Sequence, residues 1–123
     1  MPRVAVVGAS TNRSKFGNIS LRAHIRQGWT VYPIHPTESL IEDLPVFSTL
    51  SEVPERLDRI SVYLPPPKTL QLLDEICAIP HEELWLNPGS EDAEVIEKAR
   101  QLNLVPILAC SIVDIGENPS SFL

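Results

Sequence analysis

The 123-residue sequence lacks the features that mark several specialised protein classes. No apolar run approaches the roughly 20 residues that a membrane-spanning helix needs, so we expect no membrane partner. The only cysteines, Cys77 and Cys110, are too few for a disulfide scaffold, and His24, His35 and His81 are too scattered for a metal site. The apolar part of the opening MPRVAVVG is too short for a signal peptide, and we therefore expect a cytoplasmic protein.

Acidic residues are missing from the first 37 positions, although the whole chain carries a net charge of −6. Residues 1–37 hold five basic residues and a charge of +5, whereas residues 38–123 hold all 16 acids and a charge of −11. The negative total argues against a nucleic-acid partner. The asymmetry can be chance and solvated helix faces, or a positive anion site on an acidic body. The second reading is favoured because Arg13 and Lys15 fall in one short loop.

That loop lies within the opening stretch RVAVVGASTNRSKFGN, residues 3–18. Val4 to Val7 form a compact apolar and β-branched run, which is typical of a strand buried on both faces. Gly8-Ala9-Ser10 follows as a tight turn, and a helix is predicted to begin near Phe16. A strand, a turn of small residues and a helix N-terminus together predict a phosphate-binding loop, because free backbone N–H groups and the positive helix end point at one place.

The rest of the chain alternates strand and helix patterns. Apolar runs predict strands at residues 4–7, 30–34, 59–64, 83–86 and 104–109. Helices are predicted at residues 16–27, at residues 68–79 with Cys77 on the buried stripe, and after an N-cap at Ser90. Residues 19–26 also alternate like a strand, but Gly28 is placed as a helix stop, and the crossover between parallel strands favours a helix. Residues 46–47 predict a short extended piece, and Ser51 predicts the cap of a helical turn.

This alternation predicts one α/β domain over residues 1–123, with a Rossmann-like, doubly wound, parallel five-stranded sheet and helices on both faces. In such a sheet, ligands bind beyond the carboxyl ends of the strands, where the strand order reverses. Small residues and prolines let a ligand approach the backbone closely. They dominate the turns expected there, which are Gly8-Ala9-Ser10, His35-Pro36, Pro65-Pro66, Asn87-Pro88-Gly89 and Cys110-Ser111.

Two familiar nucleotide-binding patterns are absent. The dinucleotide pattern G-x-G-x-x-G needs a glycine two residues after Gly8, where the sequence has Ser10. No acid ends the second strand to bind a ribose diol, since His35 stands there. The ATP-binding pattern G-x-x-x-x-G-K-[ST] is missing too, because Arg13 stands where its second glycine should be.

The motifs VAVVGAS, RSKFGN, VYPIHP, SVYLPP, ELWLNPG and PILAC, in this order, resemble those of the small stand-alone CoA-binding proteins. These proteins are similar to the CoA-binding domain of the succinyl-CoA synthetase alpha subunit. The resemblance covers nearly the whole chain, from Arg3 to Cys110. It implies a Rossmann-like fold that binds coenzyme A or an acyl-CoA, with no catalysis established for the stand-alone proteins. From the residues themselves we expect no catalytic residues and no metal.

The resemblance also implies a role for each strand-end segment. The turn over the pyrophosphate of coenzyme A corresponds to Gly8, Ala9 and Ser10. The polar positions that face the phosphates correspond to Arg13, Lys15 and Asn18. The end of the second strand, beside the adenosine part, matches Ile34, His35 and Pro36. The third-strand end beside the nucleotide matches Leu64, Pro65 and Pro66, and the turn near the pantetheine arm matches Asn87, Pro88 and Gly89. Cys110 matches a cysteine that follows the fifth strand in many members.

Three functions remain open on the sequence. A binding protein for coenzyme A is favoured, and an absent acid at His35 suits a ribose that carries a 3′-phosphate. The second is an enzyme acting on an acyl-CoA or a nicotinamide dinucleotide, although the sequence contains no recognisable nucleophile–base set. The third is a redox adaptor in which Cys110 forms a mixed disulfide with the thiol of coenzyme A. A protein partner or a homo-oligomer is left open.

Overall fold

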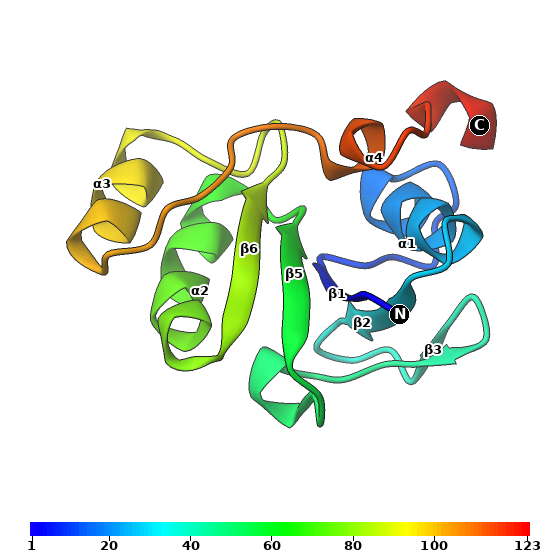
Figure 1. Cartoon of the computed structure of the whole chain (residues 1–123), viewed down its shortest axis with the longest axis horizontal. Coiled ribbons are helices and arrows are strands. Elements are labelled where there is room, and N and C mark those ends of the chain that lie inside the picture. Colours follow the sequence, from blue (N-terminus) through cyan, green and yellow to red (C-terminus); the bar gives the residue numbers. More distant parts are fainter.

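The computed structural model describes residues 1–123, and a parallel sheet in the order β2-β1-β5-β6 forms its centre (Figure 1). The strands of this sheet are β1 (Arg3–Val7), β2 (Thr30–Ile34), β5 (Leu57–Val62) and β6 (His81–Leu86). The helices are α1 (Phe16–Arg26), α2 (Pro66–Ala78), α3 (Ala93–Gln101) and the short α4 (Ser111–Asp114). A hairpin of β3 (Leu40–Ile41) and β4 (Leu44–Pro45) and two 3₁₀ turns, η1 (Leu50–Glu52) and η2 (Pro119–Phe122), complete the chain. None of the helices is both long enough and apolar enough to cross a membrane.

The predicted fifth strand at residues 104–109 is wrong, so the sheet has four parallel strands and a separate two-stranded hairpin. Only Ile107 of this segment pairs with β6. Its N–H donates to the carbonyl of Leu84 at 2.8 Å, and its carbonyl accepts the N–H of Leu86 at 2.9 Å. Pro106 has no N–H to extend the ladder, and the Val105 side chain is 88% exposed.

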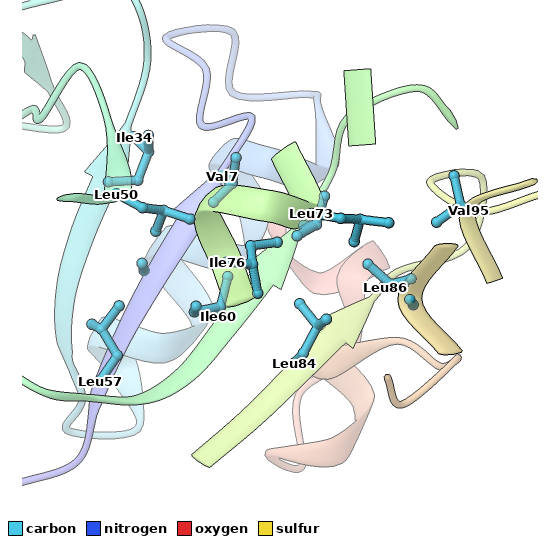
Figure 2. Packing of buried hydrophobic residues seen from close by; sticks show 13 residues of the cluster. Val7, Ile34, Leu50, Leu57, Ile60, Leu73, Ile76, Leu84, Leu86 and Val95 are labelled. Atoms are coloured by element: carbon cyan, nitrogen blue, oxygen red, sulfur yellow. The ribbon is translucent and has the colours of Figure 1, made fainter. Parts of the chain in front are cut away.

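Successive side chains of β1 point to opposite faces of the sheet. Val4 and Val6 pack with α1 and the hairpin, whereas Ala5 and Val7 join the larger cluster beneath α2 and α3. Figure 2 shows that larger cluster, in which side chains from the strands meet those of α2 and α3. The predicted helices on both faces are therefore present.

The connection from β2 to β5 contains no α-helix. Ile41 of the hairpin packs on the α1 face, while Leu50 of η1 packs on the α2 face. The short extended piece predicted at residues 46–47 is present at Phe47, which pairs with Ile34. Ser51 lies inside η1 rather than capping it, since Thr49 holds the N-cap position. The α2 face beside β2 is thus covered by a single helical turn.

Several local predictions need correction. Cys77 is exposed because the buried stripe of α2 consists of Thr69, Leu73 and Ile76. The N-cap of α3 is Asp92, whose carboxylate accepts the Val95 N–H at 2.9 Å. The Ser90 hydroxyl instead donates to the carbonyl of Asn87 within the preceding turn, at 2.7 Å.

The helix predicted over the ambiguous residues 19–26 is confirmed. Its alternating sequence arises because α1 is covered on two sides. The sheet packs against Leu21, and the carboxyl-terminal segment packs against Ile19 and Ala23 through Ile112. A helix buried between two layers shows a wide apolar face, and this blurs the 3.6-residue period.

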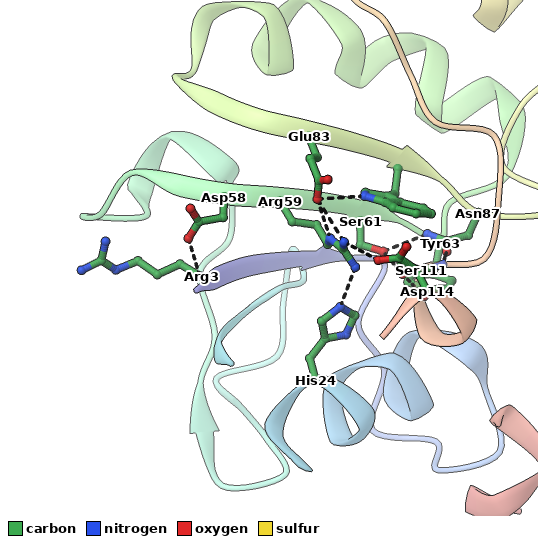
Figure 3. A network of polar contacts seen from close by, with 11 residues as sticks. Arg3, His24, Asp58, Arg59, Ser61, Tyr63, Glu83, Asn87, Ser111 and Asp114 are labelled. Atoms are coloured by element: carbon green, nitrogen blue, oxygen red, sulfur yellow. Dashed lines mark hydrogen bonds and ion pairs between the residues drawn. The ribbon is translucent and has the colours of Figure 1, made fainter. Parts of the chain in front are cut away.

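Arg59 ties the α1 face of the sheet together (Figure 3). Its guanidinium is buried and binds Glu83 at 3.0 Å and Asp114 at 2.7 Å. It also stacks on the rings of Trp29 and Trp85, at 4.7 and 4.5 Å from their centroids. Two carboxylates and two aromatic faces compensate the desolvation of this charge, and they connect β5, β6 and α4.

His24 of α1 faces the same guanidinium. Its Nδ1–H donates to the carbonyl of Ser20 at 2.8 Å, which leaves Nε2 as an acceptor 3.5 Å from Arg59. Burial, and to a smaller extent the neighbouring Arg59 charge, lower the pKa of His24 to about 4, against the opposing effects of the Ser20 bond and of Asp114. His24 is therefore a neutral acceptor at the centre of this network.

Protonation of His24 makes the stability of the fold depend on pH. The unfolded chain takes up this proton near pH 6.5, whereas the folded chain takes it up only near pH 4. Stability therefore falls as the pH is lowered between these values. From pH 7.5 to pH 5 the wild type should lose about 2 kcal/mol more than a His24→Gln variant in urea unfolding. Parallel pH profiles for the two proteins would contradict this assignment.

Candidate functional site

A cleft of about 1050 Å³ opens at the carboxyl ends of β1, β2 and β5. The turns after these strands line it, together with the start of α1, one face of α2, the residues around η1 and the turn after β6. Eleven of the sixteen residues selected from the sequence line this cleft: Gly8, Ala9, Ser10, Lys15, Ile34, His35, Pro36, Leu64, Pro65, Pro88 and Gly89. Arg13, Asn18, Pro66, Asn87 and Cys110 do not line it.

Two glycines allow the first turn to form the cleft wall. Gly8 has a φ of +87°, and a Cβ there would lie 2.9 Å from the carbonyl oxygen of Tyr63. A Cβ on Gly17 would collide with the carbonyl oxygen of Gly8. Gly17 therefore performs the close helix–strand packing that the last glycine of a dinucleotide pattern performs, although the spacing differs from that pattern.

Of the backbone amides between Gly8 and Gly17 that have no hydrogen-bond partner within the chain, five belong to residues that line the cleft. These five are the amides of Gly8, Ala9, Ser10, Phe16 and Gly17. Lys15 occupies the N-cap position of α1 without a side-chain cap, so nothing covers the first N–H groups of the helix. Free amides at the positive end of a helix are groups that bind anions in proteins.

The start of α2 offers the cleft a charged side chain instead of free backbone amides. Pro66 and Pro67 have no N–H, and the amide of Lys68 bonds to the carbonyl of Pro65 at 3.0 Å. The first turn of α2 therefore offers no free amide to a ligand. It offers the Lys68 side chain, which lines the cleft as Lys15 does. Sequence analysis missed Lys68, although its place just after a proline triplet marks the first turn of a helix.

Asn18 and Arg22 lie behind the loop that joins β1 to α1. The buried Asn18 side chain donates to the carbonyl of Ser10 at 2.8 Å and accepts from Arg22 Nε at 2.7 Å. Arg22 in turn donates to the carbonyl of Arg13 at 2.6 Å. These contacts attach both halves of the loop to α1, so this pair positions the loop without lining the cleft.

The Arg13 side chain does not line the cleft. It pairs with Glu42 of the β3–β4 hairpin at 3.4 Å, and the same carboxylate accepts from Asn18 at 3.3 Å. The hairpin thus neutralises one of the two cations that the sequence places in the loop. Lys15 and Lys68 supply the positive charge at the cleft instead.

Asn87 connects the carboxyl-terminal segment to the sheet (Figure 3). Its amide nitrogen donates to Ser61 Oγ at 2.9 Å, and its carbonyl oxygen accepts the Ser111 N–H at 2.9 Å. Ser111 Oγ also lies 3.0 Å from the hydroxyl of Tyr63. Burial raises the pKa of Tyr63, so this phenol stays a neutral hydrogen-bonding group. Asn87 therefore holds the fold in place, and its neighbours Pro88 and Gly89 line the cleft.

Cys110 lies just before α4 and outside the cleft lining. It is half-buried and packs with a cluster of Ile19, Ala23 and Ile112 behind α1. Pro66 opens α2 and does not line the cleft either.

His35 is held in one orientation at the end of β2. Its Nδ1 accepts the backbone N–H groups of Thr37 at 3.1 Å and Glu38 at 3.0 Å. An Nδ1 that accepts two amides carries no proton, so the neutral ring carries its proton on Nε2. Since His35 lines the cleft, this Nε2–H is a donor at its edge.

The far end of the cleft lies between η1 and α2, and sequence analysis missed it. Ser48, Thr49 and Leu50 line one side, and Gln71, Leu72 and Glu75 line the other. Glu75 accepts the Leu50 N–H at 2.8 Å, which links the two sides. Lys68, Gln71 and Glu75 are spaced three and four residues apart, so they share one face of α2, and this spacing was the signal in the sequence.

Comparisons with known proteins identify the family and the fold of this chain. The model of the family described as CoA binding domain matches residues 2–115. A conserved hypothetical protein from Pyrococcus furiosus is 31% identical, with 93% of this chain and 99% of that chain covered and a TM-score of 0.84. A hypothetical protein from Pyrococcus horikoshii, 18% identical with a TM-score of 0.82 over 91% of this chain and 79% of that chain, shares the fold.

A larger enzyme contains a similar unit. The dinucleotide-forming acetyl-coenzyme A synthetase 1 of Ca. Korarchaeum cryptofilum, solved with phosphate and ADP, is 27% identical with a TM-score of 0.73. The match covers 85% of this chain and 25% of that enzyme. The family match over most of the sequence, together with these structures, shows that this chain belongs to the CoA binding domain family.

Proposed function

We propose that residues 1–123 form one unit that binds coenzyme A in the cleft, with the pyrophosphate at the turn between β1 and α1. The observation that carries this proposal is the group of five unpaired amides, from Gly8 to Ser10 and at Phe16 and Gly17, on the cleft wall. Such amides bind phosphate oxygens at a helix start without any change of conformation.

The charges around the cleft support the same ligand. Coenzyme A carries a pyrophosphate and a 3′-phosphate, and Lys15 and Lys68 lie on the cleft wall to complement them. No acid stands at the end of β2, where a dinucleotide-binding site would place one for the ribose diol. The adenosine part then lies beside His35 and Pro36, and the pantetheine arm lies beside Pro88 and Gly89.

We propose binding without catalysis. Among the residues that line the cleft, no serine is hydrogen-bonded to a histidine, so no nucleophile is activated by that base. Cys110 lies outside the cleft lining, which separates it from the proposed ligand.

Exchanging the lysines tests where the phosphates bind. A Lys15→Ala, Lys68→Ala double variant should bind coenzyme A at least about tenfold more weakly in calorimetry, because each lysine contributes a charge-assisted contact. The Arg13→Ala variant should stay within about threefold of the wild type, since Arg13 pairs with Glu42. A wild type that does not bind coenzyme A below millimolar concentration would overturn the proposal. A loss in Arg13→Ala as large as in the double variant would overturn the assignment of the lysines.

Substitution of Arg22 tests whether coenzyme A binding requires the loop to be fixed before the ligand arrives. The Arg22→Ala variant should weaken coenzyme A binding about tenfold and speed hydrogen exchange at residues 12–15, because both the Asn18 and Arg13 contacts are lost. Arg26→Ala is the matched control, since Arg26 stacks on Phe122 as Arg22 does but has no contact with the loop. Equal affinity for the Arg22 variant and the wild type would show that the loop needs no such support.

A further inference from the structure

The far end of the cleft offers hydrogen-bond acceptors rather than cations. Ser48 Oγ and Thr49 Oγ1 both donate their protons to Glu52, so toward a ligand their oxygens can only accept. Glu75 accepts the Leu50 N–H through Oε1, and its second oxygen, Oε2, makes no hydrogen bond within the chain. Gln71 adds an amide that can both donate and accept. This end therefore suits a ligand that presents N–H donors.

The walls of this end are apolar and the rim is polar. Ile34 and Leu50 form a buried floor, and Leu72 lies on α2 beside Gln71. A flat aromatic ring can cover such a floor while its edge reaches the acceptors. This surface offers a phosphate no cation.

The charged side chains of α2 divide the cleft into two regions that suit different parts of one ligand. Lys68 and Glu75 are seven residues apart on the same helix, which places them about 10 Å apart along its axis. A carboxylate beside bound phosphates would repel them, whereas a carboxylate two turns away is free to bind another group. The cleft therefore has a cationic part near the start of α2 and an anionic part near Leu50.

We infer that the space between η1 and α2 binds the adenine base, with Glu75 selecting the exocyclic 6-amino group over the 6-oxo group of other purines. This inference rests on the proposed function and assigns the recognition of its base. The Glu75 carboxylate accepts an N–H of the amino group, and it repels the carbonyl oxygen that hypoxanthine or guanine presents at the same position. Gln71 can pair with N1 of the ring through its amide nitrogen.

The test compares purine 3′,5′-bisphosphates that differ only in the base. Calorimetry would measure adenosine 3′,5′-bisphosphate and inosine 3′,5′-bisphosphate against the wild type, Glu75→Gln and Glu94→Gln, with coenzyme A as a reference ligand. Glu94 is an exposed carboxylate on α3 with no ion pair, which makes it the matched control. The wild type and Glu94→Gln should favour the adenosine ligand at least about tenfold. Glu75→Gln should narrow or reverse that preference, because its amide can donate to the 6-oxo group.

The outcomes separate this inference from the proposed function. If the wild type binds coenzyme A but does not distinguish the two bisphosphates, the adenine assignment is overturned and the proposed function stands. An unchanged preference in a folded Glu75→Gln protein also overturns it. If the wild type binds neither coenzyme A nor the bisphosphates, both proposals fall. The wild-type comparison decides the matter even if the Glu75 variant does not fold.

Discussion

The close approach of Gly17 to the carbonyl oxygen of Gly8 is the constraint on which the cleft depends. Any side chain at position 17 would push the start of α1 away from the end of β1. Phe16 and Gly17 would then no longer line the same cleft as the residues of the turn. Two glycines therefore bring the turn and the helix start to one cleft wall, and the surrounding contacts preserve that geometry.

Two polar networks keep the surrounding elements in position. On the α1 face, Arg59 joins β5 and β6 to α4, and Asn87 joins the same strands to the segment at Ser111. Behind the loop, Asn18 and Arg22 attach the carbonyl groups of the loop to α1. Each network satisfies buried polar groups, so each removes the alternative positions that a loosely packed segment could adopt. The first loop of the cleft is thus attached to α1, and the segment at Ser111 is attached to the sheet.

The strand–helix alternation of the sequence predicted most of this fold, because it follows from local apolar spacing. The extra strand at residues 104–109 could not be excluded, since apolar spacing does not reveal that Val105 faces solvent. The strand-end turns were likewise placed correctly, and most of their residues line the cleft. Arg13 and Asn18 were expected at the ligand, and the structure places them outside the cleft lining, since a sequence does not show that they turn toward Glu42 and the carbonyl of Ser10. The η1 side of the cleft depends on tertiary contact between Leu50 and Glu75, and no local pattern encodes that contact.

The central claim is that the unpaired amides of the first turn bind phosphate oxygens. The most direct measurement is a nuclear magnetic resonance titration of ¹⁵N-labelled protein with coenzyme A, which follows the backbone amides of Gly8, Ala9, Ser10, Phe16 and Gly17. This account predicts that their amide-proton resonances move downfield as they donate to the pyrophosphate, while those of α3 stay in place. Bound coenzyme A that leaves these five resonances unmoved would contradict the account.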